Sequence, residues 1–278
     1  MPKTGETLTD RRIIKRTTIR IARLALAMSL AMAMTIGKDF SLEARQAVFG
    51  QRQIQFYVPY SGSTPVYLPP VLLVAHNAGN QESTARRALG HQSAGMEIDI
   101  RYEGGVLYAT HSAPSSLVPT RAWQVPRLGE AFGYTAGATV LKLDLKSTGQ
   151  SALDSLVRFV DGRPTDQQII FVSKHQDALI YLGSELDDTL AFLSVGSAAE
   201  VDALLEQDGR LDGVDGLSIP EWTLTPERVI QLKERGYLID AWTVNDVERL
   251  VELAALGVDV ITTDNLAFFD MASGPAES

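Results

Sequence analysis

Acidic side chains end two neighbouring apolar runs of this sequence. In MEIDI, Glu97 and Asp99 stand two residues apart, so on a strand both carboxylates point to the same side. In TVLKLDLK, Asp144 ends the next run. If both runs are parallel strands, the three carboxylates meet at one rim, and such hard oxygen ligands suit Ca²⁺ or Mg²⁺ better than Zn²⁺. The alternative is a rim network of ion pairs with Lys146 or Arg101.

Two histidines are expected beside these carboxylates. His76 ends the apolar run that starts at Val71, and His111 lies between the two acidic runs. One imidazole can take a proton from an attacking hydroxyl while the other gives a proton to the leaving oxygen, which is what phosphodiester cleavage requires. Lys146 would supply positive charge to a phosphoryl oxygen. Trp242 ends a later run, and we interpret it either as a wall of the substrate pocket or as core.

The elements that would position these residues alternate regularly. Eight apolar runs of strand length are separated by helical patterns, which is typical of βα units and a parallel sheet. Glycines such as Gly236 and Gly257 follow the helical patterns, where helices commonly end. Eight units indicate an α/β fold of the (β/α)8 TIM-barrel type, and a doubly wound sheet is the alternative. The strand-like runs cover residues 71–76, 96–101, 139–145, 168–173, 189–195, 215–220, 237–244 and 258–263.

The connection from Tyr102 to Ala138 is unusually long. Its first part, EGGVLYATHS, predicts a small β-excursion that delivers His111, and VPRLGEAFGY predicts a short helix. The connection opens at the carboxyl ends of the strands, where TIM barrels have their active sites.

The 278 residues divide into three predicted parts. Residues 1–37 carry seven basic and two acidic side chains and the uncharged run LALAMSLAMAMTIG, as in a signal peptide or a membrane anchor. Residues 38–70 are rich in Pro, Gly and Ser at their end and indicate a linker or N-terminal arm. Residues 71–278 form the predicted barrel domain. The first part predicts a protein that is exported (periplasmic or secreted), or anchored in a membrane and facing outside the cytoplasm.

Charge and composition exclude several classes of protein. The net charge is −9, and because residues 1–37 carry +5, the remainder carries −14. An acidic body of this kind binds nucleic acid poorly. The chain has no cysteine, which excludes disulfides, thiolate metal sites and a cysteine nucleophile.

Several short motifs of this sequence resemble, in the same order along the chain, those of the glycerophosphodiester phosphodiesterase family. The resemblance extends over about residues 71–270. The matching residues are His76-Asn77-Ala78-Gly79, Glu82-Ser83-Thr84, Gly95-Met96-Glu97-Ile98-Asp99, His111-Ser112, Asp144-Leu145-Lys146, Trp242-Thr243-Val244-Asn245 and Thr263-Asp264, with VPRLGEAF similar to the family's Pro-x-Leu-x-Glu helix.

The resemblance implies a metal-dependent phosphodiesterase TIM barrel. A divalent ion, Mg²⁺ or Ca²⁺, would be bound at Glu97, Asp99 and Asp144, and His76 and His111 would be the general acid and base. The implied reaction hydrolyses a glycerophosphodiester to sn-glycerol 3-phosphate and an alcohol. A substrate hydroxyl attacks first, and water then opens the resulting cyclic phosphate.

Three positions depart from the family pattern. Asn77 stands where the family has Arg, which removes a bidentate phosphate contact. Asp144 replaces a Glu, and Ser112 follows His111 where the family has Asp. Related sphingomyelinase D-like barrels also have Asp-x-Lys and lack that Arg. They release the headgroup of a lysophospholipid or sphingolipid and leave a cyclic phosphate.

The expected partners follow from this resemblance. The substrate is a small phosphodiester or a lysophospholipid, contacted by Asn77, Lys146 and Trp242, and the N-terminus provides possible membrane association. Two alternatives stay open: a sphingomyelinase D-like phospholipase, and a catalytically silent barrel that binds phospholipid headgroups.

Overall fold

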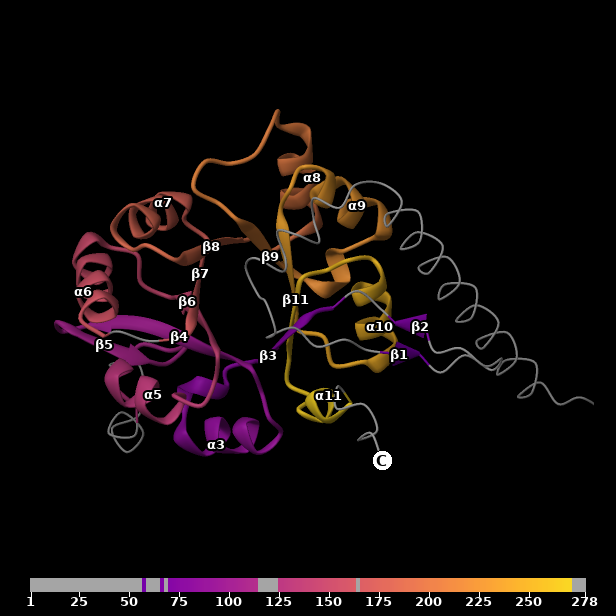
Figure 1. Ribbon diagram of the computed structural model, residues 1–278. Coiled ribbons are helices and arrows are strands. Elements are labelled where there is room, and N and C mark those ends of the chain that lie inside the picture. Colours follow the sequence, from indigo (N-terminus) through magenta and orange to yellow (C-terminus); the bar gives the residue numbers. More distant parts are fainter. Residues whose placement is uncertain (1–56, 59–65, 68–69, 115–124, 164–165, 272–278) are drawn as a thin grey trace, which may run out of the picture.

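Eight parallel strands of the computed structural model close into a barrel (Figure 1). The structure describes residues 57–58, 66–67, 70–114, 125–163 and 166–271. The barrel strands are β3 (Leu72–Ala75), β4 (Gly95–Glu103), β6 (Val140–Leu145), β7 (Gln168–Ser173), β8 (Thr189–Ser194), β9 (Gly216–Pro220), β10 (Leu238–Trp242) and β11 (Val260–Thr263). Each pairs with the next in this order, and β11 pairs back with β3. The predicted TIM barrel is therefore confirmed, because a doubly wound sheet would leave two edges open.

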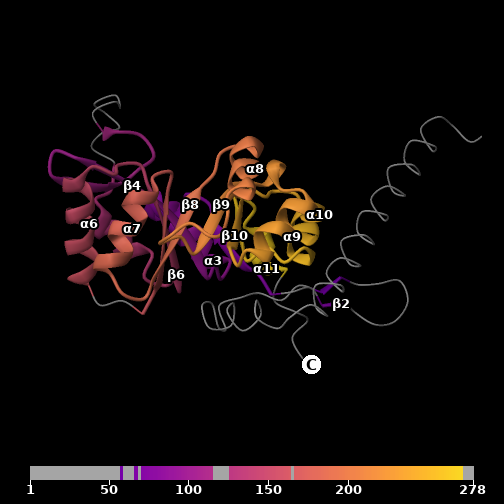
Figure 2. The ribbon, with the colours of Figure 1, turned by 90° about the horizontal axis from the view of Figure 1, so that it is seen from above.

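Helices cover the outside of this ring (Figures 1 and 2). They are α3 (Glu82–Gly90), α5 (Leu128–Tyr134), α6 (Gln150–Asp161), α7 (Gln176–Glu185), α8 (Ala198–Glu206), α9 (Pro226–Glu234), α10 (Val247–Ala255) and α11 (Ala267–Asp270). Ser197, Thr225 and Asp246 cap three of the helices by accepting bonds from backbone N–H groups of the first turn. Gly236 and Gly257 follow α9 and α10 with φ of 78° and 87°, a conformation that favours glycine.

The strand side chains alternate between two environments. Residues such as Ile98, Leu141 and Leu143 point outward and pack against the helices in the main core. The inward side chains form two sets. The apolar interior cluster comprises Leu72, Val74, Val140, Ile170, Val172, Phe192, Leu238 and Val260. The polar interior cluster comprises Glu97, Asp99, Lys142, Asp144, Ser218, Asp240 and Thr262, which all lie on strands of the ring.

The long connection after β4 forms the predicted excursion. β5 (Val106–Ala109) pairs antiparallel with the second half of β4 through a turn at Gly104 and Gly105, whose φ values are 57° and 85°. The predicted short helix is α5. This hairpin lengthens β4 beyond the barrel and carries the chain to His111.

The N-terminal predictions fall mostly outside the described residues. Within the arm, β1 (Tyr57–Val58) pairs antiparallel with β2 (Val66–Tyr67). The signal peptide or anchor predicted at residues 1–37 lies entirely outside the residues that the structure describes. In the part of the chain that the structure describes, no helix has the length and apolar character to cross a membrane.

Candidate active site

His76 lies at the carboxyl end of β3 and is held from one side by Asp264. The backbone N–H of His76 donates to the carbonyl of Thr263 at 2.9 Å, which extends the β3–β11 ladder by one residue. The imidazole Nδ1 is 2.8 Å from Asp264 Oδ1. Because a carboxylate can only accept, this contact selects the tautomer with its proton on Nδ1 and leaves Nε2 as an acceptor.

Asn245, in the loop after β10, holds Asp264 in turn. Its amide nitrogen donates to Asp264 Oδ2 at 3.0 Å, and its amide oxygen accepts from the Asp264 backbone N–H at 2.9 Å. Partial burial raises the pKa of Asp264, but the hydrogen bonds from Asn245 and His76 outweigh it and lower that pKa below its ordinary value. Asp264 is therefore kept ionised beside the imidazole.

The Nε2 atom of His76 faces the carboxylate of Glu97. The two are 3.6 Å apart, and the Asn77 side-chain amide lies 3.0 Å from Nε2. Asn77 adopts the left-handed conformation, with φ of 53°, which Asn tolerates better than most residues. Its backbone N–H consequently reaches Glu97 Oε2 at 3.1 Å. Asn77 thus contacts both His76, a candidate general base, and Glu97, a candidate metal ligand.

The three predicted metal ligands stand on adjacent strands. Asp99 on β4 lies in register with Asp144 on β6, and Glu97 lies one pleat deeper. Glu97 and Asp99 are 4% and 1% exposed, so both carboxylates need polar partners. Asn80 supplies one, since its amide nitrogen donates to Asp99 Oδ2 at 2.7 Å and its oxygen accepts from the Asp99 N–H at 2.8 Å.

A glycine brings this turn onto β4. A Cβ atom at Gly79 would lie 2.3 Å from Ile98 Cγ1, closer than real contacts allow. Only glycine therefore lets the segment after His76 approach β4 closely enough for Asn80 to reach Asp99.

Two lysines neutralise the carboxylates. Lys146 Nζ lies 2.6 Å from Asp144 Oδ2 and 3.0 Å from Asp99 Oδ1, and Lys142 Nζ lies 3.2 Å from Glu97 Oε1. Burial lowers the pKa of Lys146, but Asp144 and Asp99 outweigh it and raise that pKa. The ion-pair network that the sequence left open as an alternative is therefore present, although its deeper member is Lys142 rather than Arg101.

The three carboxylates offer the oxygen donors that a hard cation prefers and lie on adjacent strands, but Lys142 and Lys146 occupy them. In the described residues, no group of three His, Cys, Asp or Glu side chains stands close enough to hold a metal ion. Glu97, Asp99 and Asp144 would hold one after Lys146 leaves its two carboxylates. Lys146 can do so because its side chain is 20% exposed at the rim.

His111 lies on the same rim beyond β5. The Thr110 N–H donates to the Asp99 carbonyl at 2.8 Å, which fixes the chain next to the carboxylates. Arg101 donates from Nε and Nη2 to the His111 carbonyl at 3.2 and 2.9 Å. The sequence placed Arg101 among the rim carboxylates, whereas here it anchors the His111 backbone. The imidazole of His111 is exposed to solvent.

Trp242 ends β10 and forms an edge-to-face pair with Trp222. Their ring centroids are 6.1 Å apart at 78°. Trp222, in the short helix η4 (Glu221–Thr223), is 68% exposed, and Trp242 is only partly buried. Of the two interpretations of Trp242, its place at the carboxyl end of the strand favours the pocket wall.

Sequence reasoning missed several of these residues. Lys142 and Asp240 lie inside apolar runs and were not singled out. Lys142 is two residues before Asp144, so the strand alternation could have placed both side chains on the same face. Asn80 gave no signal because its role depends on a turn conformation. Asp264 was indicated only as part of the Thr263-Asp264 motif, and its contact with His76 gave no signal in the sequence.

Comparisons with known proteins agree on one family. The model of the glycerophosphoryl diester phosphodiesterase family matches residues 138–267. No curated protein matches the sequence.

Solved structures share the barrel. A phosphodiesterase from Oleispira antarctica, in complex with the product sn-glycerol-3-phosphate, is 20% identical with a TM-score of 0.60, over 74% of this chain and 96% of that one. A glycerophosphodiester phosphodiesterase from Parabacteroides distasonis is 20% identical with a TM-score of 0.58, over 72% and 95%. The enzyme from Thermotoga maritima is 18% identical with a TM-score of 0.55, over 72% and 97%. At these identities the likeness shows the common fold.

Proposed function

We propose that this chain, which belongs to the glycerophosphoryl diester phosphodiesterase family, hydrolyses a glycerophosphodiester to sn-glycerol 3-phosphate and an alcohol. The observation that carries the proposal is the orientation of His76. Its Nδ1 is held by Asp264 and its Nε2 opens beside Glu97, which is the arrangement of an oriented general base.

The first chemical step fits this geometry. His76 Nε2 takes the proton of a glycerol hydroxyl as that oxygen attacks phosphorus, and Asp264 stabilises the imidazolium that forms. The bond from phosphorus to the leaving oxygen breaks, and His111 donates a proton to that oxygen. Lys146 places positive charge near the phosphoryl oxygens. Water then opens the cyclic phosphate with the two histidines in exchanged roles.

A divalent cation, Mg²⁺ or Ca²⁺, belongs to this proposal. Bound by Glu97, Asp99 and Asp144, it would neutralise negative charge on the phosphoryl group. The carboxylates are present as donors of suitable chemistry, and Lys146 is the group that has to give way.

Variants of the two histidines test the assignment. The full chain is incubated with glycerophosphocholine and Ca²⁺ or Mg²⁺, and sn-glycerol 3-phosphate is measured. His76→Ala and His111→Ala are each expected to lower kcat by at least about 100-fold, the scale of a lost general acid or base. Near wild-type rates in both variants would refute the acid–base assignment. EDTA is expected to abolish turnover, and unchanged turnover would refute the metal requirement.

Product masses separate the alternatives. Hydrolysis ends in sn-glycerol 3-phosphate, whereas a cyclic phosphate that persists would support the sphingomyelinase D-like reaction. A silent headgroup-binding barrel would form neither product from a panel of diesters and lysophospholipids.

The N-terminal segment completes the proposal. The basic residues and apolar run within residues 1–37 support export, or anchoring with the barrel outside the cytoplasm. Fractionation of cells that express the full chain and a chain without these residues tests it. Equal cytosolic recovery of both chains would contradict it.

A further inference from the structure

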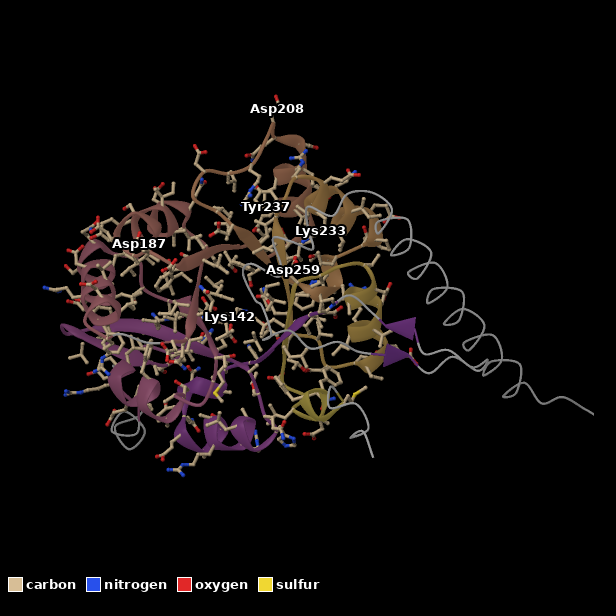
Figure 3. All side chains as sticks on the ribbon, in the orientation of Figure 1. Lys142, Asp187, Asp208, Lys233, Tyr237 and Asp259 are labelled. Carbon is tan, nitrogen blue, oxygen red and sulfur yellow. The ribbon has the colours of Figure 1, made fainter. Side chains whose placement is uncertain are left out.

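Lys142 lies inside the barrel, as a member of the polar interior cluster. It belongs to β6 and points inward between Val140 and Asp144 (Figure 3). Its side chain is 2% exposed. A buried ammonium group is costly unless charges and hydrogen bonds compensate for its lost hydration.

Three partners provide that compensation. Lys142 Nζ lies 2.6 Å from Asp240 Oδ2 on β10, 2.9 Å from Thr262 Oγ1 on β11 and 3.2 Å from Glu97 Oε1 on β4. The contacts with Asp240 and Thr262 are hydrogen bonds, and the contact with Glu97 is an ion pair. The side chain therefore spans the barrel interior and is tied to three strands besides its own.

Asp240 is itself held in place. Ser218 Oγ donates to its Oδ2 at 2.7 Å, and Thr262 Oγ1 donates to its Oδ1 at 2.8 Å. Lys142 is therefore enclosed between two carboxylates, those of Asp240 and Glu97, which balance its positive charge.

Lys146 and Lys142 consequently differ in how far their side chains can move. Lys146 stands at the rim and can swing into solvent, which would release Asp99 and Asp144. Lys142 is enclosed and anchored to Asp240, so it stays beside Glu97. Because Oε2 of Glu97 already accepts from the Asn77 N–H, both carboxylate oxygens are engaged.

We propose that Lys142 is a fixed internal counter-ion of Glu97 that weakens the divalent cation site of this barrel, leaving Asp99 and Asp144 as its main ligands. The inference depends on the proposed function only in taking these carboxylates as the cation site. Lys142 acts through Glu97 and is a positioning residue. Removing its charge should free Glu97 for the cation.

A charge-neutral pair of substitutions tests the proposal. In the double variant Lys142→Gln with Asp240→Asn, one positive and one negative charge are lost together, and the two amides can still bond to each other and to Thr262. Calcium is titrated into the metal-free full chain and binding is measured by calorimetry. The double variant is expected to bind Ca²⁺ about 10–100-fold more tightly than the wild type, the range in which groups around ligands change metal affinity.

The chain offers a matched control in Lys233 and Asp259. They form another buried pair at 2.7 Å, with side chains 8% and 0% exposed, between α9 and the amino end of β11. Figure 3 labels Lys233 and Asp259 at a different place in the molecule from Lys142. Lys233→Gln with Asp259→Asn is expected to leave Ca²⁺ affinity within about twofold of wild type. An equal gain in both double variants would overturn the proposal.

Single substitutions keep the test decisive if the double variant does not fold. Because Lys142 already occupies Glu97, Glu97→Gln should change Ca²⁺ affinity less than about twofold, while Asp99→Asn should weaken it at least tenfold. Equal losses in these two variants would overturn the proposal, as would unchanged affinity in a folded Lys142→Gln/Asp240→Asn protein or no Ca²⁺ binding by any variant. Binding is measured without substrate, so a chain that binds as expected but cleaves no diester would refute the proposed hydrolysis alone.

Discussion

The apolar and polar interior clusters fill the same barrel by different physical means. Members of the apolar cluster, such as Leu72 and Phe192, are buried without polar partners and are stabilised by non-directional packing. Members of the polar cluster each need a partner in a defined direction, as Asp240 does with Lys142 and Ser218. The difference teaches that the apolar strand positions of the interior secure stability, while the polar positions beside them use part of that stability to orient charges.

The largest effect is expected where the polar cluster loses one member. Lys142→Met leaves Asp240 charged and without its cation inside the barrel. Breaking one side of a buried pair typically costs about 3–5 kcal/mol in the free energy of unfolding. Urea denaturation followed by circular dichroism measures it. A loss below about 1 kcal/mol would mean that the two clusters do not differ as described.

Removal of apolar volume should affect stability alone. Leu72→Ala is expected to reduce the free energy of unfolding by about 2–5 kcal/mol, because it leaves a cavity in the apolar cluster. Its kcat should stay within about twofold of wild type at a temperature where the protein is folded. A large fall in kcat without unfolding would show that the apolar cluster also orients the site.

A smaller effect is expected at the rim from Asp264→Asn. The amide can donate to His76 Nδ1 and so favour the wrong tautomer, which should lower kcat by at least about tenfold, or about 1.4 kcal/mol in the activation barrier. Asp270→Asn is the matched control, since Asp270 lies 2.8 Å from His91 Nδ1 away from the rim. It should leave kcat unchanged, and equal losses in both variants would contradict the assignment.

The smallest effect is in the pH dependence of stability. Because the pKa of Asp264 is lowered in the folded chain, its bonds stabilise the fold above the unfolded value of about 4. That contribution is lost as the pH falls through the lower folded pKa. With a side chain 57% exposed, it should be below about 1 kcal/mol. The stability difference between wild type and Asp264→Asn should shrink below pH 4, and a difference that grows would contradict this sign.

The fold was predictable because it depends on patterns that repeat. The eight apolar runs and the glycines after the helical patterns indicated the barrel, and the Gly-Gly turn indicated the β5 hairpin. Spacing also predicted that Glu97 and Asp99 share one face. By contrast, Lys142 and Asp240 are 98 residues apart, and only barrel closure brings them together. The contact of Asp264 with His76 likewise depends on β11 pairing with β3.

The unusual length of β4 has a consequence for how this enzyme can diversify. The strand runs through the barrel wall and on into the hairpin with β5. Glu97 and Asp99 therefore lie on the same continuous strand that, through β5, leads the chain to His111. Side chains on one continuous strand keep their spacing when neighbouring loops change. The segment after His111 can then be lengthened, shortened or exchanged to accept other leaving alcohols, while Glu97 and Asp99 keep their spacing.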